Sequence, residues 1–419
     1  MMSRCVTSSG GVLQDKVRQG EHESFWKAAG RVANELGTPF YVYLPDRLRT
    51  AYQSMTMGAE SWGDCHVAYS LKTNPLFELL RDLQSLGSWI EVVSAWECTI
   101  AKRAGFPGSA MTLSGPVKTG PLGELPIEKG TPACLNIDSM EELGAIHAAS
   151  HRSFPTPVGV RICMPGDGSP LSRFGLEADT GEADTAITRI RGDERLRLRS
   201  VQIHLGTQIR DPREYVRAVQ VAREMWRRLA LDRSVRLNLG GGFPYDHDRP
   251  IENQRFDPRS FFAELGRTWG TARPVLVIEP GRWIAAPSVA LVARVASCKR
   301  RRNEPTIVVI DSGTNHNVMG AFHEHEWWFP ETEAVEDRFR MCGPLCMEDD
   351  IMSGPMTRQP PKVGSLVAMR NAGAYSLSLS RTFIQPRPPV VTFEGDSEYR
   401  VLVGRETPDL AYSLGPHLS

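Results

Sequence analysis

The chain has 419 residues, 41% hydrophobic and 23% charged, and its 49 basic residues balance its 49 acidic ones. This length admits two domains, or one barrel with an appended domain. A formal net charge of zero gives no overall attraction to nucleic acid or to an anionic membrane, and it leaves open small substrates that are recognised locally.

The cysteines and the apolar runs predict the compartment. The eight cysteines are scattered, and the closest pair, Cys342 and Cys346, has no histidines at a spacing that would complete a zinc site. Residues 1–20 lack an apolar core of signal-peptide length, and no run of about 18 apolar residues occurs. We therefore expect a reduced, cytoplasmic protein that binds no metal.

The first 44 residues divide into a leader and a packing segment. Residues 1–22 are polar, and we expect them to be poorly ordered. An amphipathic pattern predicts a helix over Ser24–Leu36, which Gly37 ends, followed by a strand over Phe40–Leu44. We expect residues 23–44 to pack with the C-terminal domain.

Strand and helix patterns alternate through residues 45–287. Helices are expected over Leu76–Leu86, Met140–Ala149 and Pro212–Leu229. Eight apolar runs predict strands that begin near Val67, Trp89, Ala110, Ala133, Val158, Leu198, Val235 and Val275. Eight such repeats predict an α/β fold of the (β/α)8 barrel type, with its site at the C-terminal ends of the strands. A doubly wound sheet is the alternative, but its glycine-rich loop would follow the first strand rather than lie at Gly240.

From residue 288 the pattern changes to short strands with little helix between them. The segment over residues 351–364 is rich in proline and glycine and predicts a loop. Strands are expected over Leu291–Val295, Thr306–Ile310, Ser365–Met369, Val390–Phe393 and Tyr399–Val403. Residues 288–419 are therefore predicted to form an all-β domain.

Lys72 lies where the apolar strand that begins near Val67 ends, before Asn74 and Pro75 stop it. A lysine at the mouth of a buried strand is desolvated, which would lower its pKa and favour a free amine able to attack a carbonyl. The alternative is a lysine that reaches the surface from a strand end.

Three further polar groups follow predicted barrel strands. His204 follows one strand, Gly240, Gly241 and Gly242 follow the next, and Glu279 and Arg282 flank a Pro-Gly turn after the last. Each has a structural alternative: a packing histidine, a tight turn and a surface ion pair. Together they supply an amine, an imidazole plate, backbone N–H groups for a phosphate and a carboxylate for a ring nitrogen. These are the requirements of pyridoxal 5'-phosphate.

The chain resembles the ornithine/diaminopimelate decarboxylase family, the alanine-racemase-like class of pyridoxal-phosphate enzymes, from about Thr38 to Val403. The resemblance rests on several blocks in the same order: Tyr69–Asn74, Glu91–Glu97, Ser172–Gly175, HLGTQ at 204–208, GGGFP at 240–244, EPGR at 279–282, Cys342–Cys346 and Gly373–Tyr375. It implies an amino acid decarboxylase that acts as a homodimer.

The resemblance also implies roles for single residues. Lys72 would bond covalently to the cofactor, His204 would stack on its ring, and Glu279 would pair with the ring nitrogen. Arg161 would lie near the phenolic oxygen. The phosphate would be surrounded by Thr207, Gly240, Gly241, Gly242, Gly281, Arg282 and Tyr375. Cys346 would come from the other subunit and control protonation after carbon dioxide leaves.

The sequence departs from the family where the distal end of the substrate is recognised. Met347 replaces an acidic residue that binds a distal ammonium group, and Met319 and His323 replace an arginine and a tyrosine that bind a distal carboxylate in diaminopimelate enzymes. We therefore expect a substrate with an acylated or modified distal end, as in siderophore or aminoglycoside assembly, and a carrier protein could present it. His316, Met319, His323 and Met347 are predicted to contact it, with Phe322 beside them.

Several alternatives stay open. Glu348 or Asp349 could take the acidic position if the loop register shifts, which would restore diaminopimelate or another basic amino acid as the substrate. A racemase or epimerase would keep the carboxylate, and a non-catalytic carrier of the cofactor would need neither Cys346 nor Tyr375.

Overall fold

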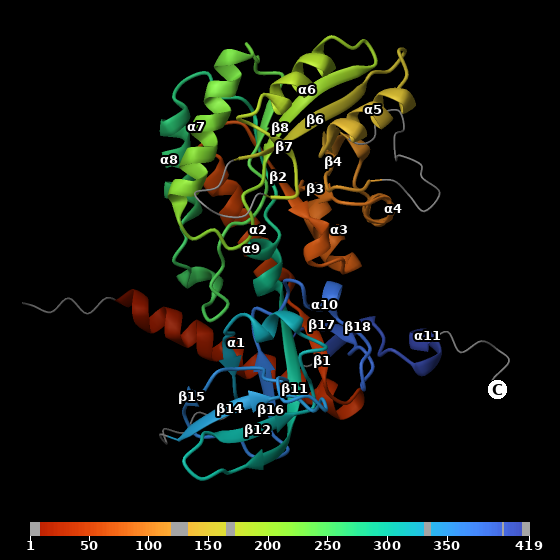
Figure 1. Ribbon diagram of the computed structural model, residues 1–419. Coiled ribbons are helices and arrows are strands. Elements are labelled where there is room, and N and C mark those ends of the chain that lie inside the picture. Colours follow the sequence, from red (N-terminus) through yellow and green to blue (C-terminus); the bar gives the residue numbers. More distant parts are fainter. Residues whose placement is uncertain (1–8, 119–132, 165–171, 331–336, 396–397, 413–419) are drawn as a thin grey trace, which may run out of the picture. The chain divides into compact units, whose positions relative to one another are not determined.

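The computed structural model describes residues 9–118, 133–164, 172–330, 337–395 and 398–412. The chain divides into two compact units (Figure 1). Pro45–Ser288 with Gly373–Ser378 form the first, which we name the barrel unit. Met1–Leu44, Val289–Ala372 and Leu379–Ser419 form the second, which we name the β unit.

The barrel unit contains a closed parallel sheet. Its strands lie in the order β5-β4-β3-β2-β10-β9-β8-β6, and pairing of β5 with β6 closes the barrel. The two-residue strand β7 (Leu176–Glu177) extends from β6. The barrel strands are β2 (Cys65–Ser70), β3 (Trp89–Val92), β4 (Met111–Leu113), β5 (Cys134–Ile137), β6 (Thr156–Cys163), β8 (Leu196–Ile203), β9 (Arg236–Asn238) and β10 (Leu276–Ile278). All eight predicted strands, and the predicted (β/α)8 class, are confirmed.

Helices follow the barrel strands. Those predicted, α3 (Phe77–Ser85), α5 (Met140–Ala149) and α7 (Pro212–Arg228), lie within one residue of the expected bounds. The others are α2 (Pro45–Ala59), α4 (Ala95–Arg103), α6 (Glu182–Arg191), α8 (Pro258–Trp269), α9 (Arg282–Ala285) and α10 (Ser376–Leu379), with 3-10 turns η1 (Leu71–Thr73), η2 (Gly108–Ala110), η3 (Ile251–Asn253) and η4 (Ala286–Ser288).

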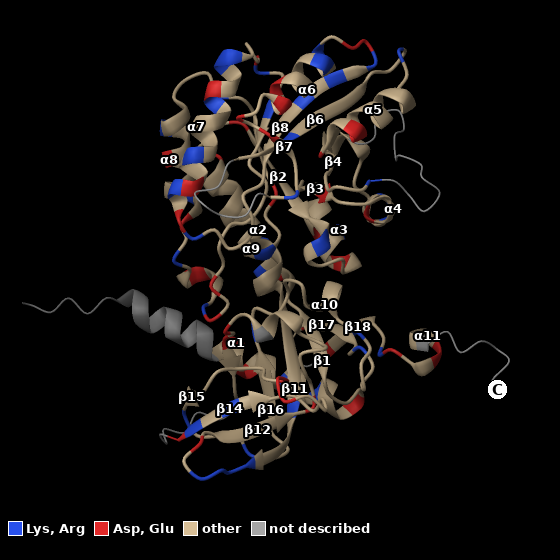
Figure 2. Ribbon diagram, viewed as in Figure 1, with Lys and Arg blue, Asp and Glu red and all other residues tan. Residues whose placement is uncertain are grey.

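Helix α7 shows why these segments become barrel-facing helices. Asp211 caps its N-terminus by accepting a hydrogen bond from the backbone N–H of Arg213, and Pro212 occupies the first turn. Tyr215, Ala222 and Trp226 on one face are buried. Charged side chains occupy the other face, as Figure 2 shows for the outer helices α6 and α7. This division of faces fixes the helix against the sheet.

The β unit is built on a second sheet, in the order β15-β14-β12-β11-β1-β17-β18, with β16 paired to β11 and β13. Its strands are β1 (Phe40–Tyr43), β11 (Val289–Lys299), β12 (Thr306–Ile310), β13 (Trp327–Trp328), β14 (Arg338–Cys342), β15 (Met356–Thr357), β16 (Leu366–Met369), β17 (Val390–Glu394) and β18 (Glu398–Val403). Turn η5 (Val318–Ala321) and helix α11 (Pro408–Tyr412) complete the unit. Strands β13, β14 and β15 were not predicted, and β15 lies inside the segment expected to be a loop.

Helix α1 (Ser9–Glu35) begins earlier than the predicted start at Ser24, within the segment expected to be a leader. Its residues Phe25 and Val32 pack against Val42 of β1 and Val292 of β11 in one apolar cluster. Residues 1–8 lie outside the described part of the chain.

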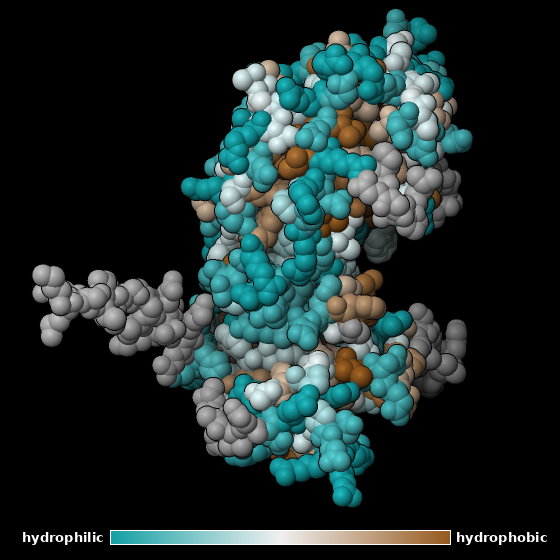
Figure 3. Space-filling model, turned by 60° about the vertical axis from the view of Figure 1, so that its left-hand side comes forward, coloured by the Kyte–Doolittle hydropathy of each residue, from teal (hydrophilic) through white to brown (hydrophobic). Residues whose placement is uncertain are grey.

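Figure 3 shows a face on which hydrophilic side chains dominate and apolar ones form small patches. Within the described ranges, no helix is both long enough and apolar enough to cross a membrane.

Candidate active site

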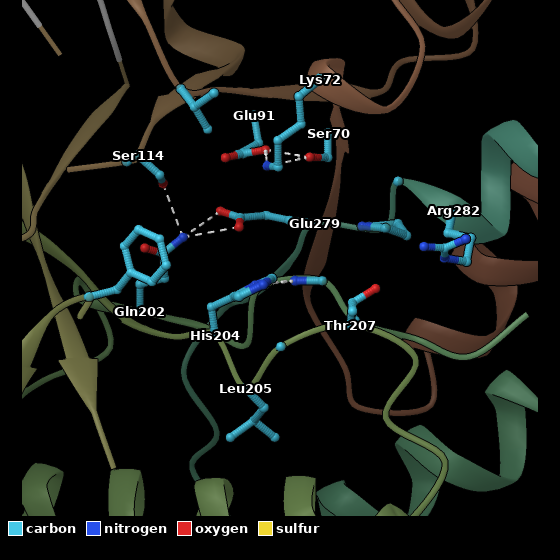
Figure 4. A pocket seen from close by; sticks show the side chains of 18 of the residues that line it. Ser70, Lys72, Glu91, Ser114, Gln202, His204, Leu205, Thr207, Glu279 and Arg282 are labelled. Carbon is cyan, nitrogen blue, oxygen red and sulfur yellow. Dashed lines mark hydrogen bonds and ion pairs between the residues drawn. The ribbon is translucent and has the colours of Figure 1, made fainter. Parts of the chain in front are cut away.

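A cavity of about 560 Å³ opens at the C-terminal ends of the barrel strands. All the residues predicted to bind a cofactor line it except Gly240. Figure 4 shows Lys72, Glu279 and His204, from three different strand ends, directed into the same space, with Thr207 and Arg282 to one side.

Lys72 lies in turn η1, directly after β2, and its side chain is 41% exposed to the cavity. Its Nζ atom donates to Oε2 of Glu91 and to Oγ of Ser70, both at 2.7 Å. Burial lowers the pKa of Lys72, but the charge of Glu91 and its hydrogen bond outweigh burial and raise it above the ordinary value. The prediction of a lowered pKa is therefore wrong: without a carbonyl partner, Lys72 is an ammonium ion.

Glu279 is the buried carboxylate of the cavity and is 4% exposed. Its Oε1 accepts hydrogen bonds from Asn238 at 2.7 Å and from Gln202 at 2.9 Å. Gln202 also donates to Oγ of Ser114 at 3.0 Å, which fixes its orientation. Burial, with the nearby charge of Glu91, raises the pKa of Glu279 to about 7. Glu279 can therefore hold or release a proton near neutral pH.

His204 presents a neutral ring to the cavity. Burial, with the charges of Arg161 and Lys72, lowers its pKa to about 4. Its Nδ1 atom accepts a hydrogen bond from the backbone N–H of Gly241 at 3.1 Å, so the remaining ring proton belongs on Nε2. The ring is thereby held in one orientation, which suits stacking rather than charge pairing.

The glycine segment differs from the predicted cradle of three free N–H groups. The N–H of Gly240 donates to the side chain of Asn238 at 2.8 Å, and that of Gly241 is taken by His204. Of these three glycines, only Gly242 has an N–H that donates to no other described residue. Gly242 has a φ of +94°, which residues with a side chain rarely adopt. A Cβ atom at this position would also lie only 2.5 Å from the carbonyl oxygen of Gly206, so the position requires glycine.

The loop that follows His204 is tied to the glycine segment. The N–H of Ile209 donates to the carbonyl of Gly242 at 2.9 Å. The side-chain amide of Gln208 donates to the carbonyl of Tyr245 at 2.9 Å and accepts from its N–H at 2.7 Å. Tyr215 of α7 donates to the carbonyl of Gly241 at 2.8 Å. These bonds position Thr207 and Gly242 on the same wall of the cavity.

Arg282 is a buried cation on that wall. It is 7% exposed, one terminal nitrogen lies 3.1 Å from Nε2 of His247, and its Cζ lies 5.1 Å from the ring centre of Tyr375. The buried Nε atom has no hydrogen-bond partner in the structure. Tyr375 is held by its own N–H, which donates to the carbonyl of Thr73 at 2.8 Å. An anion with several oxygens would satisfy Arg282.

Arg161 projects from β6 into the cavity and is 11% exposed. It lies 3.6 Å from Oδ1 of Asp138, and its Cζ is 4.5 Å from the ring centre of Phe174. The buried Lys118 pairs at 2.7 Å with Glu142 of helix α5.

The predicted substrate contacts lie in the β unit. His316 is fully buried, Nδ1 lies 3.1 Å from Ser312 Oγ, Nε2 lies 3.1 Å from the carbonyl of Pro386, and burial lowers its pKa to about 4. Its contact with the substrate stays a prediction, and both of its ring nitrogens lie within hydrogen-bonding distance of protein atoms. Met319 and His323 are half-buried, whereas Cys346 and Met347 are exposed.

Sequence reasoning missed the residues that hold the predicted ones in place. Glu91 fixes Lys72, Gln202 and Asn238 hold Glu279, and His247 holds Arg282. The available signal for Gln202 was a polar residue two positions before His204, since alternate residues share one face of a strand. Glu91 begins one of the blocks that carry the resemblance, but no role was assigned to it, and nothing in the linear pattern marks His247.

The set of groups fits pyridoxal phosphate. It combines a lysine in a cavity, a flat neutral imidazole, a buried carboxyl group that can exchange a proton, and an arginine with an unsatisfied buried donor. Fold and cavity thus define a pyridoxal-phosphate enzyme of the barrel class.

Comparison with known proteins agrees. The family model described as "Pyridoxal-dependent decarboxylase, pyridoxal binding domain" matches residues 48–286, and the chain belongs to this family. A diaminopimelate decarboxylase from Deinococcus radiodurans is 28% identical over 385 residues, covering 90% of this chain and 95% of that protein. An L-glutamyl acyl-carrier-protein decarboxylase from Niallia circulans is 24% identical over 405 residues, covering 89% and 92%.

A solved structure shares the fold. The diaminopimelate decarboxylase from M. jannaschii in complex with L-lysine has a TM-score of 0.83 at 23% identity, covering 93% of this chain and 95% of that one. The protein is therefore a pyridoxal-phosphate-dependent amino acid decarboxylase, a carboxy-lyase. The cofactor supplies an electron sink for the bonding pair left when the carboxylate departs.

Proposed function

We propose that the cavity residues divide the work of holding the cofactor. Lys72 forms the covalent link, and Glu279 shares a proton with the ring nitrogen, which its pKa of about 7 supports. His204 packs on the ring, and Arg161 lies beside the phenolic oxygen. The phosphate is held by Arg282, the N–H of Gly242, Thr207, Gly281 and Tyr375, with Gly240 and Gly241 shaping the turn.

We propose further that the substrate is an amino acid with an acylated or otherwise modified distal end, of the citryl-diaminopropionate type found in siderophore assembly. The observation that supports this most is that both carboxylates lining the cavity lie at the proposed cofactor position: Glu91 contacts Lys72, and Glu279 is held by Gln202 and Asn238. Neither is placed to bind the distal end of a substrate. Met347, which replaces the acidic residue of the family, supplies no charge either.

The second subunit is also part of the proposal. Cys346 and the three residues after it are exposed, and the loop is anchored by the buried Asp350, which accepts from the N–H of Leu345 at 2.8 Å. Such a loop can present Cys346 to another chain, so we propose a homodimer with shared sites. The seven described cysteines are free thiols, in keeping with a cytoplasmic location.

Diaminopimelate is the second candidate substrate. It is favoured by the name of the Deinococcus radiodurans relative, which aligns over 90% of this chain. The carrier-bound substrate named for the Niallia circulans relative favours the first proposal, because that substrate is also modified at one end.

The deciding experiment is carbon dioxide release by the cofactor-loaded protein. The panel contains meso-diaminopimelate, lysine, ornithine, arginine, an N-acylated diaminopropionate and a glutamyl thioester. We expect turnover of the acylated or thioester compounds only. Rapid turnover of diaminopimelate or of a free diamino acid would contradict the proposal and return the enzyme to primary metabolism.

A further inference from the structure

Arg173 is a charged residue of the cavity that neither the cofactor nor the proposed chemistry uses. It lines the cavity and is exposed, in the segment that precedes β7. Its Cζ atom lies 4.5 Å from the ring centre of Phe174, the same distance as Cζ of Arg161. The aromatic ring therefore holds both guanidinium groups by cation–π contact.

The other charged groups of the cavity have partners. Lys72 pairs with Glu91, and Arg161 lies 3.6 Å from Asp138. Arg282 contacts His247 and faces the proposed phosphate position. Among the described residues, no carboxylate forms an ion pair with Arg173. Within the described ranges, Arg173 is thus a cavity cation without a carboxylate partner.

We propose that Arg173 recognises the distal end of the substrate, and that this end carries a negative charge. The inference rests on the proposed function, and it narrows the class from masked amino acids to those masked by an acid, such as a dicarboxylic or tricarboxylic acyl group. Phe174 provides the apolar wall beside that group, and Arg173 provides the ion pair.

The position of Arg173 suits a distal group. The guanidinium groups of Arg161 and Arg173 are at most twice 4.5 Å apart, because each lies that far from the centre of the same ring. The Arg161 side chain is 11% exposed, beside the proposed cofactor position, whereas Arg173 is exposed. Arg173 therefore lies on the solvent side of Phe174, where the part of a substrate most remote from the cofactor would lie.

The competing explanation is that Arg173 binds the α-carboxylate that every amino acid substrate possesses. The two explanations predict that different substrates bind more weakly when the charge of Arg173 is removed. Loss of a distal contact affects only substrates with a distal anion, whereas loss of an α-carboxylate contact affects all of them equally.

The test compares diaminopropionate carrying an N-succinyl group with diaminopropionate carrying an N-acetyl group. Cofactor-loaded wild type, Arg173→Gln and Arg173→Lys are assayed, and Arg189→Gln, at an exposed arginine of α6 outside the cavity, is the control. For Arg173→Gln we expect KM for the succinyl compound to rise about fivefold, the size of a partly exposed ion pair, with kcat nearly unchanged.

The acetyl compound should show little change, and Arg173→Lys should recover most of the affinity. Added salt should raise KM for the succinyl compound in wild type but not in Arg173→Gln. An equal loss for both compounds, or no loss for either, would overturn the assignment of Arg173 while leaving the proposed function intact. If wild type turns over neither compound, the assignment of Arg173 to an acidic acyl group is overturned, and the proposed function itself fails if diaminopimelate or a free diamino acid is turned over instead.

Discussion

Replacing Glu279 by glutamine should change how the stability of the cofactor-free protein depends on pH. The carboxyl group is buried, and its pKa is raised from 4.5 to about 7, mainly by burial. This difference corresponds to about 3 kcal/mol by which the folded state disfavours the ionised form. Glutamine has a similar shape but no proton to lose.

The sign follows from proton binding. Well below pH 4.5 the carboxyl group is protonated in both the folded and the unfolded chain, so its ionisation does not change the free energy of unfolding. Between pH 4.5 and about 7 the unfolded chain loses the proton first, so folding becomes less favourable as pH rises. Above pH 7 the whole penalty of about 3 kcal/mol is present.

The measurement is urea unfolding of cofactor-free wild type and Glu279→Gln at pH 5 and pH 8, with equal m-values as the check on comparability. Glutamine keeps the bond from Asn238 but places an amide against Gln202, a cost of about 1 kcal/mol at both pH values. From pH 5 to pH 8, the free energy of unfolding of the variant should therefore rise by about 2 to 3 kcal/mol relative to that of wild type. Glu214→Gln, on the exposed face of α7, is the matched control. If the free energies of unfolding of wild type and Glu279→Gln change with pH in parallel, Glu279 does not have the raised pKa from which this prediction is derived.

Three other substitutions follow from the site. Lys72→Ala should abolish cofactor-linked absorbance and turnover together, and full activity in that variant would contradict the role of Lys72. Cys346→Ala should slow carbon dioxide release or divert the product toward transamination, and an unchanged rate and product ratio, measured by chromatography, would remove Cys346 from the site. His247→Phe should weaken cofactor binding about tenfold in equilibrium dialysis, because Arg282 loses its partner at 3.1 Å; unchanged binding would show that His247 does not position Arg282.

The sequence by itself determined the barrel. Short apolar runs located all eight strands, because barrel strands are buried on both faces and each therefore leaves a continuous apolar stretch in the sequence. It also located Lys72, His204 and Glu279 at strand ends, and parallel strands bring their C-terminal ends together without further information.

Strands β13, β14 and β15 had no comparable signature. Two of them contain only two residues each, and β14 (Arg338–Cys342) alternates charged and apolar residues next to a segment rich in proline and glycine. Short strands are stabilised by the neighbours with which they pair, and those neighbours are distant in sequence.

Only the tertiary structure decided the electrostatics of the site. The sequence placed Lys72 in a desolvating position and so predicted a lowered pKa, but Glu91, on the next strand, reverses the shift. Likewise, His316 looked available until folding buried it against the carbonyl of Pro386. A pKa depends on the balance between desolvation and the nearest charges, and those charges come from other strands whose registers no local pattern records.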